Sequence, residues 1–263
     1  MQQKRFYYLL KIQYLGYRLH GWQRQPNFKT VEGLVKKTLK FILPGRKVKI
    51  LGSSRTDAMV SANDGAFELF VYDSPLADIK EFMLTFNKNL PPDIRINEIK
   101  EVDGMFNIIQ HPKQKEYLYL FSFGKKNHPF CAPLMANFQE NLDIDLMKHG
   151  ALLFEGEHYF GNYCADPSEK TILVRTLTSS SIIRNALFTA NFFPENSFIF
   201  QVKGGGFLRY QIRLMMGVLV QLGKREITLD DISESLIPGN GQVTNFIAPA
   251  SGLILYKTEF AEV

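Results

Sequence analysis

Apolar and polar positions alternate along this chain in stretches that match either a strand or one face of a helix. In the first hundred residues they predict strands at 6–14, 48–51, 66–72 and 93–102, and helices at 31–42 and 75–87. The first helix has apolar residues at 31, 34, 35, 39 and 42, and Pro44-Gly45 ends it. The predicted order is therefore β-α-β-β-α-β.

The remaining residues predict the same order again. Strands are expected at 117–123, at 198–202 and at 253–260, with one long or two short strands within 172–183. Helices are expected at 145–154 and 207–222, the second ended by Gly223. Because β-α-β-β-α-β is the ferredoxin-like order, we expect an α+β fold of two ferredoxin-like halves, residues 1–106 and 107–263. Their sheets would join around a central cleft.

Composition narrows the class of protein without fixing its function. The 263 residues are 45% hydrophobic and 22% charged, which indicates a globular chain. The 31 Lys and Arg against 26 Asp and Glu give a net charge of +5, which suits a basic cleft or an ordinary basic enzyme. The polar first residues and the lack of a membrane-length apolar stretch lead us to expect a soluble, cytoplasmic protein. Cys131 and Cys164 form no CxxC pair, so we assign neither a metal site nor a disulfide.

The segment 52–58 (GSSRTDA) lies between two predicted strands and places one Arg and one Asp among small residues. Small side chains let a ligand approach the backbone closely. The Arg55 cation favours an ionised Asp57, which can then serve as a nucleophile, a base or a metal ligand. Metal binding is the weakest of these, because no Asp, Glu or His cluster lies nearby. An Asp in a loop can also simply cap its own turn.

Arginine, glycine and aromatic residues mark four further candidate segments. Lys203-Gly204-Gly205-Gly206 precedes the last predicted helix, where it forms either a phosphate-binding turn or a flexible connection. Arg209 and Arg213 are predicted on one face of that helix. Because Arg213 has apolar neighbours, it needs a carboxylate partner if it is buried.

The segment 22–25 (WQRQ) holds the only tryptophan of the chain, beside Gln23 and Arg24. Aromatic and Arg faces stack on nucleic-acid bases, while amides read base edges. A loop anchored by a buried Trp22 is the alternative. Tyr117 and Tyr119 share one face of a predicted strand, where packing in the core is the simplest role.

Taken together and in order, these segments resemble the tRNA pseudouridine synthase A family. The matching blocks are Tyr14-x-Gly16-x4-Gly21-Trp22-Gln23-x-Gln25, Arg55-Thr56-Asp57-Ala58-x-Val60, Asn89-Leu90-Pro91-x-Asp93-Ile94, Tyr117-x-Tyr119, Gly206-Phe207-Leu208-x3-Ile212-Arg213 and Ala248-Pro249-Ala250-x-Gly252-Leu253. Each block is modest alone, but together they span nearly the whole chain.

The resemblance implies an isomerase that converts uridine to pseudouridine in the anticodon stem-loop of tRNA, at positions 38, 39 and 40, without a cofactor. It implies a cytoplasmic homodimer whose basic clefts hold tRNA. It assigns Asp57 as the nucleophile, Tyr117 as the residue against the target base, Arg213 as the partner of Asp57, and Arg55 as an aid to base flipping. Gln23 and Arg24 are then expected to contact the RNA.

The chain departs from the family pattern at four positions. Ser54 and Met59 stand where the family usually has Gly, Ser61 where it usually has His, and Ile109 where an Arg is common. These departures leave open a synthase for another RNA site. A non-catalytic RNA-binding module of the same fold is the second alternative, although it would not need Asp57, Tyr117 and Arg213 together.

Overall fold

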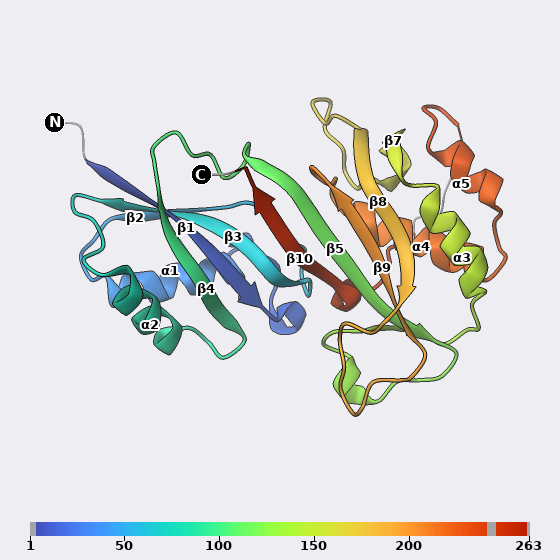
Figure 1. Cartoon of the computed structure of the whole chain (residues 1–263), viewed down its shortest axis with the longest axis horizontal. Helices are drawn as coiled ribbons and strands as arrows, with labels where there is room; N and C mark the ends of the chain where they lie inside the picture. Colours follow the sequence, from blue (N-terminus) through green and yellow to red (C-terminus); the bar gives the residue numbers. More distant parts are fainter. Residues whose placement is uncertain (1–3, 241–245, 262–263) are drawn as a thin grey trace. The chain divides into compact units, whose positions relative to one another are not determined.

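The computed structural model describes residues 4–240 and 246–261, which form two compact units. The first unit holds the residues up to Lys113 together with those from Leu255 onward, and the second holds Gln114–Ile254. The boundary differs from the expected halves by seven residues, and most of the closing strand belongs to the first unit. Figure 1 shows the elements of each unit.

The first unit follows the predicted order of elements. Its strands and helices are β1 (Arg5–Tyr14), α1 (Val31–Ile42), β2 (Val48–Gly52), β3 (Ser61–Tyr72), α2 (Ile79–Asn89) and β4 (Ile94–Val102). In its antiparallel sheet, β1 lies between β4 and β3, and β2 pairs with the other edge of β3. Residues 255–260 of β10 (Leu253–Phe260) belong to this unit and lie beside β3.

The helices of the first unit begin at capping side chains. Thr30 accepts the Gly33 N–H ahead of α1, and Asp78 accepts the N–H groups of Lys80 and Glu81 ahead of α2. A side-chain oxygen at this position satisfies amides that lack partners within the helix. The Asp78 cap explains why α2 begins at residue 79 rather than at the predicted 75.

The two faces of the first sheet are buried in different ways. Tyr8 and Leu10 are fully buried on one face, and the Tyr8 hydroxyl accepts the Leu76 N–H ahead of α2. Leu9 points to the opposite face, where it packs with Ala66 and with Ile108 from the segment after β4. The helices cover the first face, and irregular chain covers part of the second.

A buried carboxylate, Glu68, lies on this second face. Its register partner on β1 is Leu9, and its side chain is 2% exposed. Burial raises the pKa of the Glu68 carboxyl, whereas the Ile108 N–H and the Lys49 cation lower it in part. Among the described residues, its Oε1 atom has no hydrogen-bond partner. Ionising Glu68 therefore costs the folded protein free energy.

We expect Glu68→Gln to stabilise the protein more at pH 8 than at pH 4.5. A carboxyl whose pKa is raised on folding favours the folded state below its unfolded pKa, and that stability is lost as the pH rises through the folded pKa. Each tenfold change in the acid dissociation constant on folding is worth about 1.4 kcal/mol, or about 3–6 °C in Tm for a chain of this size. Melting curves of both proteins across this range measure the difference, with Glu101→Gln, an exposed carboxylate, as the control. A pH-independent difference would contradict the assignment.

The second unit contains more elements than the predicted order. It comprises β5 (Pro112–Phe123, from residue 114 onward), β6 (Ala136–Phe138), α3 (Ile144–Leu152), β7 (Gly156–Tyr159), β8 (Val174–Arg184), β9 (Ser197–Gly204), α4 (Gln211–Gly223) and α5 (Leu229–Ser235). The antiparallel strand order is β5-β9-β8-β7, and β6 adds parallel to β5. The segment 172–183 proves to contain one long strand, and β6, β7 and α5 were not predicted.

Helices α3 and α4 pack closely at a glycine. A Cβ on Gly150 would lie 2.3 Å from Leu222 Cδ2 and 3.2 Å from Leu219 Cδ2. Almost every side chain of α4 is buried, which agrees with its apolar sequence. Helix α4 is therefore closely packed within the second unit.

Candidate active site

The Asp57 loop connects β2 to β3 and is held from inside by Thr56. The Thr56 side chain is buried, and its Oγ1 lies 2.7 Å from the Tyr14 hydroxyl at the end of β1. The Thr56 carbonyl accepts the Trp22 N–H at 3.0 Å. With Thr56 turned inward, its neighbour Arg55 is exposed and Asp57 is half-buried. The loop thus presents a cation and a carboxylate near the surface from a fixed backbone.

Trp22 is a structural anchor of this region rather than an exposed stacking surface. It is 4% exposed, and its ring packs on Phe67 with centroids 6.0 Å apart. A Cβ on Gly52 would lie 2.4 Å from the Trp22 ring, so this close approach requires glycine. The backbone of Trp22 accepts the Glu32 N–H at the start of α1. The buried-anchor alternative therefore describes Trp22, and base stacking by this ring is excluded by its burial.

The two residues after Trp22 are exposed. Gln23 and Arg24 lie on the surface, and the Arg24 N–H donates to Glu32 Oε2 at 2.8 Å. Burial works to raise the pKa of the Glu32 carboxyl, but this N–H and the neighbouring Lys36 cation lower it overall. The backbone of Arg24 is thereby fixed to α1 while its guanidinium remains accessible.

Three of the four departures from the family pattern lie in the Asp57 loop or at its end. Met59 adopts a left-handed conformation with φ of 67°, which favours glycine. Ser61 accepts the Gly16 N–H at 2.9 Å, and Ser54 Oγ has no partner among the described residues. The fourth, Ile109, is exposed in the segment after β4.

In the second unit, Tyr117 and Tyr119 share a face of β5, as predicted. Tyr117 is 9% exposed and packs edge-on against Phe207, with ring centroids 5.1 Å apart. Tyr119 is fully buried and donates its hydroxyl to the Pro249 carbonyl at 2.8 Å. Burial raises the pKa of the Tyr119 phenol, although the Arg213 charge opposes this. Tyr119 therefore acts as a neutral hydrogen-bond donor that fixes residue 249.

Arg213 lies in the first turn of α4, and its contacts include a hydrogen bond and a ring contact. Its Nε donates to the Ala248 carbonyl at 2.8 Å, and its guanidinium lies 4.9 Å from the centroid of the Tyr210 ring. The Ala248 N–H donates in return to the Arg213 carbonyl. The segment 248–252 thus positions both Arg213 and Tyr119. The segment matched the family pattern, but its role was not predicted because an Ala-Pro-Ala sequence carries no chemical signal of its own.

The prediction that Arg209 and Arg213 share a helix face is wrong. Tyr210 has a left-handed φ of 63°, so α4 begins at residue 211 and Arg209 precedes it. Arg209 is instead exposed and pairs with Asp166 at 2.7 Å. The glycines at 204–206 lie several residues before the helix, so their amides do not form its first turn.

Metal binding and membrane insertion find no support in the described residues. No group of three or more His, Cys, Asp or Glu side chains in residues 4–240 and 246–261 is arranged to hold a metal ion. None of the helices in these ranges has the length and hydropathy needed to cross a lipid bilayer.

Comparison with known proteins gives consistent matches. A family model described as tRNA pseudouridine synthase matches residues 151–261. The tRNA pseudouridine synthase A of Oenococcus oeni is 32% identical over 252 residues, covering 94% of this chain and 95% of its own. The proteins of the same name from Staphylococcus aureus (strain MRSA252) and Acetivibrio thermocellus are each 32% identical, covering 95% of this chain and 90% and 98% of their own lengths.

Proposed function

Because the chain belongs to the tRNA pseudouridine synthase A family, we propose that it isomerises uridine to pseudouridine in tRNA. The observation that carries this proposal is the extent of the likeness, which covers both units rather than one. The geometry of the Asp57 loop supports it, because a braced backbone presents a carboxylate beside an exposed arginine.

The reaction exchanges one bond to the ribose for another. The bond between uracil N1 and ribose C1′ breaks, the base turns, and C5 bonds to the same carbon. The C5 proton is then lost and N1 gains a proton, so no electrons are transferred and no redox cofactor is required. We assign Asp57 as the nucleophile, since a carboxylate can trap the positive character that develops at C1′.

The remaining assignments follow from the chemistry of each side chain. Tyr117 would lie against the uracil and keep the detached base in place, and its edge contact with Phe207 fixes the ring for this role. Arg213 is proposed as the cation that balances Asp57. Arg55 is exposed, which suits a residue that replaces a base as the uridine leaves its stack. Gln23 and Arg24 would contact the RNA backbone or base edges.

The finer features of the family are part of the same proposal. They are two ferredoxin-like halves, a cytoplasmic homodimer, and a target in the anticodon stem-loop. The β-α-β-β-α-β order of the first unit, with β1 between β4 and β3, supports the first of these. Loops and stem ends are where a uridine leaves its stack at the lowest cost, which supports the last.

The proposal is tested by mapping pseudouridine in total RNA from cells with and without this protein. We expect signals that depend on the protein to fall in the anticodon stem-loops of tRNAs. Adding purified protein to RNA from deficient cells should restore them without any cofactor. Signals in another RNA or another arm of tRNA would favour the alternative target site. Unchanged maps, together with retained RNA binding, would favour a non-catalytic module.

A further inference from the structure

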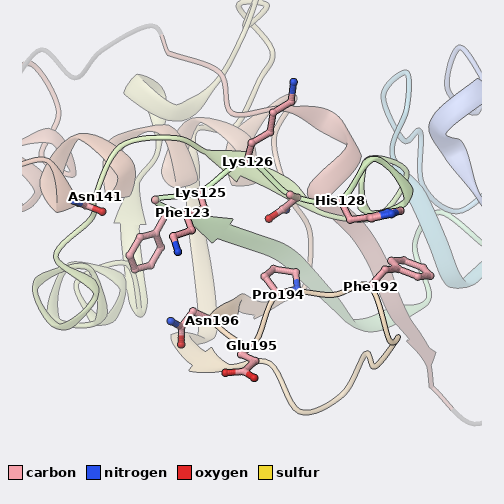
Figure 2. Close-up of a pocket in the computed structure, with 11 residues that line it drawn as sticks. Phe123, Lys125, Lys126, His128, Asn141, Phe192, Pro194, Glu195 and Asn196 are labelled. Atoms are coloured by element: carbon pink, nitrogen blue, oxygen red, sulfur yellow. The ribbon is translucent and has the colours of Figure 1, made fainter.

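The second unit contains a pocket that the proposed reaction does not use. It has a volume of about 640 Å³ and lies between the segment after β5 and the loop that joins β8 to β9. Figure 2 shows side chains from both loops around it. Phe123 at the end of β5 lines it, six residues along that strand from Tyr117, or about 20 Å. A ligand here therefore cannot be the uridine that Tyr117 would contact.

The two loops are fixed to each other. Cys131 Sγ donates to the Phe192 carbonyl at 3.3 Å, and the His128 ring lies 5.9 Å from the Phe192 ring. The Phe130 ring meets Phe192 edge-on at 5.8 Å. The β8–β9 connection covers residues 185–196, much longer than a hairpin turn requires. These contacts make the pocket a defined site rather than a gap between independent loops.

The polar lining of the pocket suits a phosphate group. Lys125 and Lys126 are both exposed, and in Figure 2 Lys126 extends away from the other labelled side chains. Asn127 carries a buried Nδ2 that has no hydrogen-bond partner among the described residues. Its Oδ1 accepts the Ser122 hydroxyl at 2.8 Å, which fixes the amide of this pocket-lining residue and leaves its N–H groups without an acceptor among the described residues.

The remaining lining suits a nucleoside. His128 and Phe192 provide aromatic surface on which a base can stack. Glu195 is exposed in the same pocket and can accept a hydrogen bond from a base amino group or a ribose hydroxyl. A carboxylate would repel a free anion such as inorganic phosphate. Glu195 therefore favours a phosphate attached to a nucleoside, whose amino or hydroxyl groups can donate to the carboxylate. The volume lies within the range of pockets that hold small organic groups.

We propose that this pocket binds a nucleotide of the substrate tRNA that lies outside the stem-loop containing the reacting uridine. Lys125 and the Asn127 amide hold the phosphate, Lys126 adds positive charge from outside the pocket, and His128 and Phe192 contact the base or the ribose. This inference rests on the proposed function, because it takes tRNA as the ligand. It adds a second point of attachment, which selects whole tRNA over an isolated stem-loop.

The test compares Lys125→Ala/Lys126→Ala with Lys37→Ala/Lys40→Ala, which removes two exposed lysines from α1. Affinity is measured for a full tRNA transcript and for its isolated anticodon stem-loop, over a range of salt concentrations. We expect the pocket variant to bind full tRNA about tenfold more weakly, with a salt slope reduced by about 1–2. Its affinity for the stem-loop and its turnover at saturating tRNA should stay unchanged, as should both affinities of the α1 variant.

Glu195→Leu provides a second variant of similar size that lacks the acceptor oxygens, and it should weaken binding of full tRNA without lowering the salt slope. Equal losses for tRNA and stem-loop would overturn the inference, since the contact would then lie in the target arm. Unchanged affinity for both RNAs would also overturn it, and a simultaneous change in oligomeric state would identify a protein interface. If the wild-type protein modified no tRNA, the proposed function would fail, while the affinity comparison would still decide the pocket.

Discussion

Asp57→Asn is expected to lower turnover by about a thousandfold or more while tRNA affinity stays within a few-fold of the wild-type value. Asparagine keeps the size and most of the hydrogen-bonding shape of aspartate but lacks the charge that meets ribose C1′. Binding should persist because it arises mainly from the basic surface. Single-turnover rates and equilibrium binding of the same tRNA measure the two effects separately.

A matched control for this variant is Asp78→Asn, which makes the same change of charge at the N-cap of α2. Asparagine caps helices as well as aspartate does, so stability and turnover should be nearly unchanged. An Asp57→Asn protein that still converts uridine at a comparable rate would remove Asp57 from the chemistry. A parallel loss of affinity and turnover would instead show that Asp57 organises its loop.

Gly16→Ala is expected to impair both stability and turnover. Gly16 begins the short 3-10 turn Gly16–Arg18 after β1, and a Cβ there would lie 2.0 Å from the Val60 carbonyl oxygen. Because the obstacle is backbone, the turn or the Asp57 loop must move. The Val60 N–H donates to the Asp57 carbonyl at 3.2 Å, so the displacement reaches the carboxylate. Overpacking of this kind costs about 1–3 kcal/mol, or about 2–12 °C in Tm.

Calorimetry and turnover measurements test this expectation together. Gly104→Ala is the control, because a Cβ at Gly104 would come no closer than 3.5 Å to the Tyr7 ring, an ordinary contact. The Gly16→Ala protein could instead have the Tm and the turnover of the wild type. The Gly16–Arg18 turn and the Asp57 loop would then move apart without a loss of stability, and the loop would be less rigid than its contacts indicate.

Local patterns predicted most elements of the fold but not their ends. Helix α1 matches its prediction because its apolar spacing and its cap agree. Strand β3 begins five residues earlier than predicted, at a polar stretch with no strand signal. There, Asn63 accepts the Gln13 side-chain amide and Asp64 pairs with Lys11. These contacts join residues about fifty positions apart, so no local window could reveal them.

The site residues were named by resemblance, whereas the structure explains how they are held. Thr56 is the clearest example, since its contacts with Tyr14 and Trp22 connect two separate sequence blocks. Met59 is another. Its left-handed backbone costs a residue with a side chain about 1–2 kcal/mol, which accounts for the usual family glycine at this position. The positive φ of Tyr210 similarly explains why α4 begins at residue 211, whereas apolar spacing alone predicted a helix from residue 207.

The membership of β10 in the first unit has a consequence for synthesis on the ribosome. Residues 255–260 lie beside β3, and Phe260 packs against the cluster of Leu9, Ala66, Phe106 and Ile108. The second unit, Gln114–Ile254, is translated between these two parts. At about 5–20 residues per second, the first unit waits roughly 7–30 s for its last strand. During that interval the edge of β3 lacks its neighbouring strand β10, and the apolar cluster lacks Phe260. We therefore expect chaperones to bind the nascent chain at this stage.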